Sequence, residues 1–338
     1  MCDVSSAPSA LPAEEAELEV EESELEVPDA LCSWLDEFCV VEDGSPPRRF
    51  STPELPQPCA REATLPFEVF ADGEGWVHSA ARSLDKNGFC VLRVADRSRP
   101  LVPDARGDAC QRYVQRRLTS LMRAVRERGV DPKMDRFTYS ELCARTLRGR
   151  RPDMRLPHQP HDHSNNPPEW ASLLASVDHW VRPVLETSTL CTAGPEGIQV
   201  DSAGCVTALP GAPEQHFHPD GTVKGLVNVF VPLVRVDAAN GPTELRLGTH
   251  EAAGDERGSN GAWDVDHGDT LAAAPNLEPG ELLLFDYRVM HRGRANATAE
   301  SRPVIYVVYA ARPGISDAHN FPNDEWLYES SKVELLSP

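Results

Sequence analysis

The chain has 338 residues, a formal net charge of -20, 40% hydrophobic residues and 30 prolines. This length suffices for one large domain with a buried core, whereas the proline content indicates that part of the chain does not fold. The negative charge argues against nucleic acid or an anionic membrane surface as the main partner, and no apolar run is long enough to span a bilayer. Nine scattered cysteines without a Cys-x-x-Cys pair indicate free thiols. Since the N-terminus does not resemble a secretory signal, we expect a cytoplasmic protein.

Residues 1–62 are rich in Glu, Pro, Ser and Ala, and we expect them to form a disordered acidic tail. An apolar stripe at helical spacing predicts a short helix near residues 31–41, formed by Leu31, Trp34, Leu35 and Phe38. This helix could dock on a protein partner or on the rest of the chain. Alternatively, the tail makes no fixed contact, and the sequence leaves both interpretations open.

Residues 63–338 have the composition of one folded domain, which begins with helices. Apolar residues at helical spacing predict three of them, at 76–86, 108–128 and 169–184. A buried strand is expected at 89–94, directly after the helix-ending pair Asn87-Gly88. A loop rich in Pro and His, at 158–168, precedes the third helix.

After about residue 197 the pattern changes to short β-type runs, with Gly and Pro between them. The runs lie at 198–200, 205–207, 226–233, 243–245, 281–285 and 304–309. Gly204 is interpreted as a break between the first two runs. Helices followed by many short strands predict an α+β fold whose strands form a barrel or a double-sheet jelly roll.

Candidate metal ligands occur at two places in this strand-rich part. His218 and Asp220 are two residues apart, so at a strand end both side chains point to the same face. His291 follows a buried apolar strand and could complete a 2-His-1-carboxylate triad, which leaves open positions on Fe(II). His216 could also bind metal, but its position one step outside this arrangement favours a supporting role.

Two candidate cosubstrate-binding residues lie in the strand-rich part. Arg302 stands eleven residues after His291 and opens the next strand. If this strand neighbours the one that precedes His291, the guanidinium could reach into the barrel mouth beside the iron and hold the distal carboxylate of 2-oxoglutarate in bidentate fashion. Asn228 could point inward to a 2-oxoglutarate oxygen or pack in its strand. Of Tyr306 and Tyr309, whose spacing is odd, at most one can face the site.

The stretch from residue 215 to residue 309 resembles the phytanoyl-CoA dioxygenase family of Fe(II)/2-oxoglutarate oxygenases. The residues that carry this resemblance are His218-Pro219-Asp220, Val229 to Leu233, Ala239 to Glu244, Gly248-Thr249-His250, Asp286, His291-Arg292-Gly293, Asn296 and Arg302. The resemblance covers about two-thirds of the chain and excludes the acidic tail.

This resemblance implies a double-stranded β-helix with iron at His218, Asp220 and His291 and with 2-oxoglutarate at Arg302. It also implies that O2 is consumed as 2-oxoglutarate is decarboxylated to succinate, coupled to hydroxylation of a C–H bond. The sequence departs from the family at 247–250, where Leu-Gly-Thr-His replaces the usual Pro-Gly-Ser-His. The absence of a peroxisomal signal counts against the lipid-degrading member itself, and Asp220 counts against a halogenase.

The expected function is therefore a dioxygenase that hydroxylates a small-molecule or lipid-like substrate. Three alternatives remain open. These are another metal enzyme on a similar barrel, a non-catalytic barrel that binds a ligand or partner, and a protein hydroxylase. The intact triad argues against the second, and Arg302 in place of the Lys usual in prolyl hydroxylases argues against the third. Substrate specificity is expected in the loops at 158–168 and 249–276.

Overall fold

The computed structural model describes residues 67–106, 108–145, 148, 150–158, 167–192, 197–252, 271–317 and 325–328. The expected acidic tail, its short helix and most of the loop at 158–168 lie outside these residues. None of the helices in the described ranges is long and apolar enough to cross a membrane.

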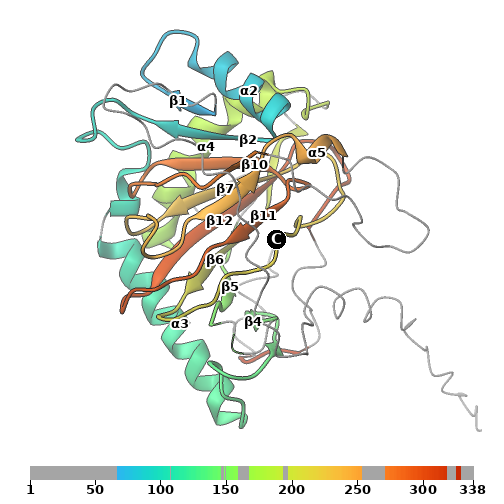
Figure 1. The fold of residues 1–338 in the computed structure, drawn as a ribbon. Helices are drawn as coiled ribbons and strands as arrows, with labels where there is room; N and C mark the ends of the chain where they lie inside the picture. Colours follow the sequence, from blue (N-terminus) through green and yellow to red (C-terminus); the bar gives the residue numbers. More distant parts are fainter. Residues whose placement is uncertain are drawn as a thin grey trace, which may run out of the picture. The chain divides into compact units, whose positions relative to one another are not determined.

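Nine strands form one large mixed sheet, in the order β1-β2-β10-β7-β12-β6-β5-β4-β3 (Figure 1). They are β1 (Glu68–Phe70), β2 (Phe89–Arg93), β3 (Phe137–Thr138), β4 (Leu142–Ala144), β5 (Asp153–Arg155), β6 (Gln199–Ala208), β7 (Leu226–Pro232), β10 (Leu282–Asp286) and β12 (Arg302–Ala310). Among the strands of the described residues, only β1 and β2 pair in parallel. A second sheet contains β8 (Thr243–Arg246), β9 (Ala272–Ala273) and β11 (His291–Gly293), in the order β11-β8-β9.

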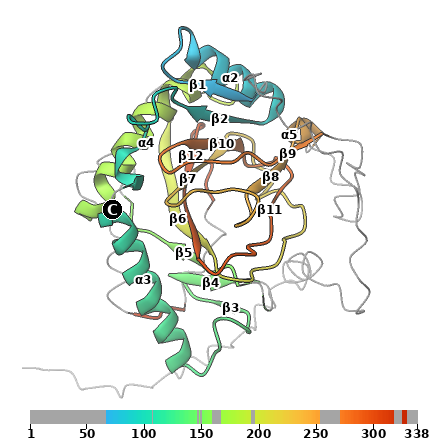
Figure 2. The same ribbon diagram turned by 60° about the vertical axis from the view of Figure 1, so that its left-hand side comes forward.

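Helices cover one face of the large sheet, and the small sheet lies on the other (Figure 2). These helices are α2 (Trp76–Asn87), α3 (Asp108–Glu127) and α4 (Pro168–Thr187), with a 3-10 turn, η1, at Pro103–Arg106. The short α5 (Thr249–Ala252) follows β8 and lies beside the small sheet (Figure 2). The three long helices confirm the expectations from apolar spacing. Gly88 ends α2 with φ 83°, and its N–H donates to the Leu84 carbonyl, as a left-handed C-cap does.

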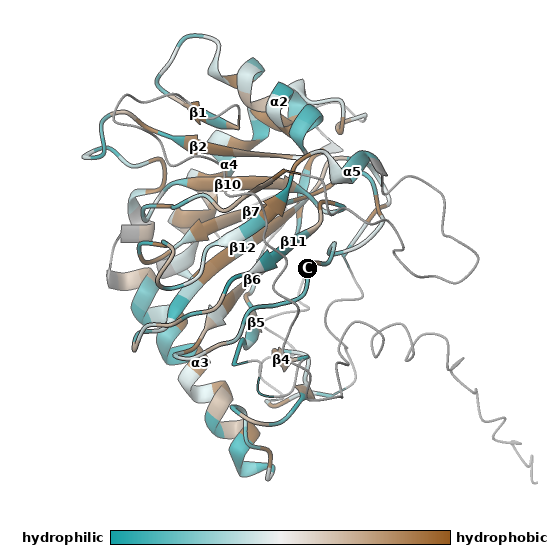
Figure 3. Cartoon of the chain, in the orientation of Figure 1, coloured by the Kyte–Doolittle hydropathy of each residue, from teal (hydrophilic) through white to brown (hydrophobic). Residues whose placement is uncertain are grey.

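Successive side chains on β12 point to opposite faces of the large sheet. Ile305, Val307 and Tyr309 belong to the core packed against the helices. Tyr306 and Val308 lie on the opposite, inner face. Figure 3 shows that the central strands of the sheet are largely hydrophobic (brown). Since side chains alternate with a period of two, Arg302 shares this inner face with Tyr306. The sheet-rich α+β fold expected from the sequence is confirmed.

One expectation about the strands was wrong. Residues 199–208 form a single strand, β6, instead of two runs separated at Gly204. Gly204 pairs with Tyr306 of β12, and a Cβ atom at Gly204 would lie 2.3 Å from the Tyr306 ring. This glycine therefore makes room for a ring that crosses the strand and does not break it.

Candidate active site

A β-bridge between two distant segments brings two histidines together. The His218 N–H donates to the His291 carbonyl, and the His291 N–H donates to the His218 carbonyl, both over 2.9 Å. His291 opens β11, whereas His218 precedes β7 in an extended segment. The backbone thus holds the two imidazoles side by side, with ring centroids 4.7 Å apart.

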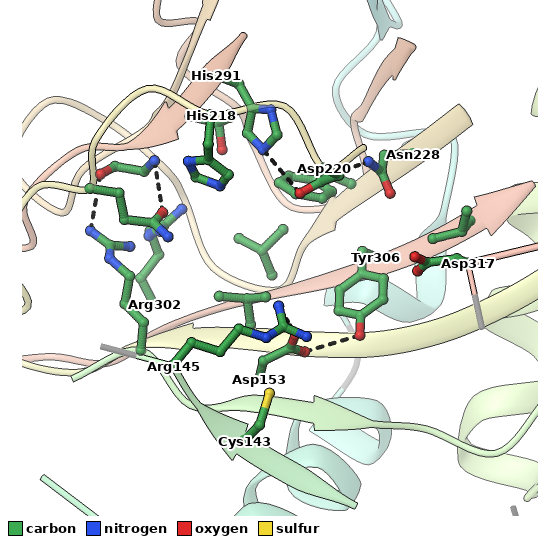
Figure 4. A pocket seen from close by; sticks show the side chains of 18 residues that line it. Cys143, Arg145, Asp153, His218, Asp220, Asn228, His291, Arg302, Tyr306 and Asp317 are labelled. Carbon is green, nitrogen blue, oxygen red and sulfur yellow. Dashed lines mark hydrogen bonds and ion pairs between the residues drawn. The ribbon is translucent and has the colours of Figure 1, made fainter. Parts of the chain in front are cut away.

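Asp220 completes a group of three potential metal ligands. One nitrogen of each histidine and a carboxylate oxygen of Asp220 all lie within 4.8 Å of one another. The His291 Nε2 lies 3.6 Å from the Asp220 Oδ1 (Figure 4). This is the donor set of a 2-His-1-carboxylate site, and its compactness fits one divalent ion. The proximity expected from the sequence is present, while iron ligation itself stays a prediction.

Hydrogen bonds to backbone carbonyls orient both imidazoles. The Nδ1 of His218 lies 2.8 Å from the His216 carbonyl, and the Nδ1 of His291 lies 2.9 Å from the Val289 carbonyl. A proton on each Nδ1 leaves each Nε2 with a free lone pair for a metal. Burial, and secondly the neighbouring His291, lowers the pKa of His218 to about 4, so this ring is neutral at neutral pH.

Two other histidines, His216 and His250, lie outside this group. The His216 side chain is exposed, and only its backbone carbonyl contacts the site. His250 is buried, and its Nε2 hydrogen-bonds to the Asp85 carbonyl over 3.0 Å, which is a structural contact.

Asn228 contacts a metal-ligand candidate directly. Its Nδ2 donates to the Asp220 Oδ2 over 2.6 Å, and the residue is buried. This bond occupies one carboxylate oxygen and turns the other toward His291. Asn228 also lines the pocket, where a cosubstrate would bind. Its expected contact with 2-oxoglutarate stays a prediction.

The three side chains lie at the edge of a pocket with a volume of about 150 Å³. The lining residues come from both sheets and from the loops between them (Figure 4). Besides the residues named above, they include Cys143, Arg145, Arg151, Asp153, Val206, Gln215, Phe230, Thr243, Gly293, Arg302, Val304, Tyr306, Val308 and Asp317. The pocket lining therefore combines polar and charged groups with apolar walls of similar extent.

Arg302 lines this pocket as a buried cation without a countercharge. The residue is 4% exposed, and its Nε has no hydrogen-bond partner. In the part of the chain that the structure describes, no carboxylate forms an ion pair with it. Burial, and secondly the nearby Arg151, lowers the pKa of Arg302 to about 9. A buried, unpaired guanidinium beside a second one favours binding of an anion.

The structure adds a group of pocket residues that the sequence analysis missed. The Tyr306 hydroxyl donates to the Asp153 Oδ1 over 3.0 Å, and Arg145 Nη1 lies 4.0 Å from the Asp153 Oδ2. Burial raises the pKa of Asp153 to about 6. As expected, only Tyr306 of the two β12 tyrosines faces the site. The alternation of charged and apolar residues from 151 to 156 is a strand pattern that could have revealed Asp153.

Comparison with known proteins identifies the family. The chain matches the family model of phytanoyl-CoA dioxygenase (PhyH) over residues 84–304. No curated protein sequence matches it. Similar solved structures include the epimerase SnoN in complex with Fe3+, alpha ketoglutarate and nogalamycin RO, with 14% identity, TM-score 0.47 and coverage of 73% of this chain and 90% of that chain.

Two further solved structures show comparable likeness. AviO1 from Streptomyces viridochromogenes Tue57 has 18% identity and TM-score 0.45, over 70% of this chain and 96% of that chain. EctD from S. alaskensis with 2-oxoglutarate and 5-hydroxyectoine has 17% identity and TM-score 0.41, over 68% of this chain and 74% of that chain. On the family match, this chain belongs to the phytanoyl-CoA dioxygenase family, whose enzymes use Fe(II), 2-oxoglutarate and O2 for oxygenase-type chemistry.

Proposed function

We propose that this protein is an Fe(II)/2-oxoglutarate-dependent dioxygenase that hydroxylates a small-molecule substrate. Its two sheets would form the double-stranded β-helix of such enzymes. One observation carries the proposal: a single pocket is lined by two features. The first is a compact group of two imidazoles and one carboxylate, and the second is a buried arginine without a carboxylate partner. A metal ion suits the first, and an organic diacid suits the second.

His218, Asp220 and His291 would hold the iron, which leaves positions for the cosubstrate on the pocket side. When bound, Fe(II) with 2-oxoglutarate and O2 supplies the oxidative decarboxylation and the C–H oxidation. The chain supplies the geometry. The two Nδ1–H groups fix the imidazole planes, and Asn228 holds the Asp220 carboxylate so that one oxygen faces the metal.

Arg302 would bind the distal carboxylate of 2-oxoglutarate. Its planar guanidinium matches a carboxylate in bidentate geometry, and burial strengthens that pairing because little water competes. Arg151 contributes further positive charge, while its own Nη2 donates to the carbonyls of Pro213 and Arg294. The end of the pocket at Arg302 would therefore attract a carboxylate.

The decisive experiment is anaerobic binding of Fe(II) and 2-oxoglutarate, followed by the metal-to-ligand charge-transfer band in the visible. We expect the band in wild type, its loss in His218→Ala and its weakening in Arg302→Ala. His216→Ala is the matched control for the histidine, since its side chain is exposed and its carbonyl is retained. Arg123→Ala, on the exposed face of α3, is the control for the arginine.

Each outcome has one meaning. A band that needs His218 and Arg302 but neither control residue supports both assignments. Loss of the band in His216→Ala as well would indicate a different ligand set. No band in folded, iron-loaded wild type would overturn the oxygenase proposal and favour a non-catalytic barrel.

A further inference from the structure

Two polar regions of the pocket lie apart from each other along β12 (Figure 4). Arg302 marks the first, and Tyr306 with Asp153 marks the second. Arg302 and Tyr306 are four residues apart on the same face of the strand, which separates their Cα atoms by about 13 Å. A cosubstrate anchored at Arg302 therefore leaves the region around Tyr306 and Asp153 to the substrate.

The fold is adapted to hold Tyr306 in this second region. Its ring lies across β6 at Gly204, where any Cβ atom would be 2.3 Å from the ring carbon and the hydroxyl oxygen. Crossing β6 brings the hydroxyl to Asp153 on β5, the next strand of the sheet. Three neighbouring strands thus cooperate to place one phenol against one carboxylate inside the pocket.

Two carboxylates line this region of the pocket. The Asp153 side chain is 17% exposed. Asp317 also lines the pocket and is 4% exposed. Its carboxylate accepts hydrogen bonds from the Tyr287 hydroxyl and from the Ser202 hydroxyl. Arg155, on the same strand as Asp153, interacts electrostatically with Tyr306. Arg145 is a cation of the pocket lining, but its side chain is 42% exposed and lies 4.0 Å from Asp153. Ion pairs this exposed contribute little, so Asp153 keeps most of its capacity to accept a hydrogen bond.

We propose that Asp153 and Tyr306 bind a hydrogen-bond donor of the substrate, a hydroxyl or a protonated amine, so that the substrate is a small polar molecule and not a fatty acyl chain. This inference rests on the proposed function, because it assigns the substrate of the same site. Methylene groups packed on Asp153 would remove its water without replacing the hydrogen bonds, which is costly. An anionic group would be repelled by Asp153 and Asp317. Phe230 and Val308 supply the apolar wall against which the C–H bonds can rest.

The test uses the full-length protein loaded anaerobically with Fe(II) and 2-oxoglutarate. Three probe panels are added in turn: methyl glycosides and inositols, primary and quaternary amines, and fatty acids with their CoA esters. Perturbation of the charge-transfer band reports binding next to the metal, and succinate formation in air reports stimulated turnover. Both readouts are repeated in Asp153→Asn and Tyr306→Phe, which keep the side-chain shapes, and in the control Tyr309→Phe on the opposite face of β12.

We expect hydroxyl or amine probes to perturb the band in wild type and in Tyr309→Phe. Asp153→Asn should weaken that binding about tenfold or more, as expected for loss of a hydrogen bond to a charged group. A neutral amide still accepts from a hydroxyl, so a larger loss for amines than for glycosides would identify the donor as cationic.

Two outcomes would overturn the inference while the proposed function stands. In the first, the band is intact but neither donor panel perturbs it. In the second, acyl probes bind and Asp153→Asn does not weaken them. Absence of the band itself would instead refute the proposed function. Thermal unfolding of each variant identifies any that does not fold, and Asp153→Asn and Tyr306→Phe each test the inference alone.

Discussion

Replacing Arg302 with methionine should stabilise the ligand-free protein while abolishing cosubstrate binding. The pKa of Arg302 falls from 12.5 to about 9 because of burial and of Arg151. At 1.36 kcal/mol per pKa unit, this corresponds to about 5 kcal/mol against the charged form at neutral pH. Methionine loses about 1 kcal/mol of packing, so a net gain of about 2–4 kcal/mol in unfolding free energy is expected.

The assay is thermal unfolding with and without Fe(II) and 2-oxoglutarate under anaerobic conditions. For a domain of this size, the gain corresponds to a rise in Tm of roughly 5–15 °C in Arg302→Met. Ligand at 100 times Kd should stabilise wild type by about 2.7 kcal/mol more than Fe(II) alone. The same addition should leave the Tm of Arg302→Met unchanged.

Arg151→Met is the matched control, because it removes a neighbouring buried charge. That change also leaves the carbonyls of Pro213 and Arg294 without their donor, so little or no stabilisation is expected. If Arg302→Met instead lowers the Tm of the ligand-free protein by several degrees, the guanidinium has an internal countercharge. The reasoning about an unpaired cation would then be refuted.

Three further changes test the other parts of the site. Asn228→Ala should lower Fe(II) affinity about 10- to 100-fold, measured by titration, because the Asp220 carboxylate loses its orienting bond; unchanged affinity would contradict this role. Gly204→Ala should displace the Tyr306 ring and cost about 1–3 kcal/mol in denaturant unfolding, whereas a neutral effect would mean that the ring has another position. Because burial raises the Asp153 pKa from 3.8 to about 6, the folded state binds its proton more tightly, and stability falls as pH rises from about 4 to 6. Asp153→Asn should remove about 2 kcal/mol of that decline, which unfolding curves at the two pH values would measure.

His291 and Arg302 could be located from sequence because one follows the apolar strand β10 and the other opens the apolar strand β12. His218 and Asp220 could be located by their two-residue spacing, which points both side chains to the same face. The buried position of Asn228 on β7 follows in the same way. Its contact with Asp220 does not, since it depends on how the preceding loop folds back.

Asp153 on β5 and Arg145 directly after β4 were missed because the alternation at residues 151–156 predicts a strand without showing where that strand pairs. β4 and β5 have three residues each, and they pair with a sheet whose register no local pattern encodes. Gly204 was misinterpreted for a related reason. Its role depends on a tyrosine about a hundred residues later in the chain, and only the antiparallel pairing of β6 with β12 brings the two together.

The β-bridge between His218 and His291 joins two of the ligand candidates through backbone hydrogen bonds, so we expect folding to bring them together without a metal ion. In small zinc domains the ion must gather its ligands from a disordered chain, so removal of the ion unfolds the protein. Here folding of the two sheets already brings the ligands together, so the metal does not have to offset the loss of chain entropy. Removal of the metal by a chelator should therefore leave the ligands in place. An enzyme that loses its metal through oxidation would then regain activity by binding another Fe(II) ion, without refolding.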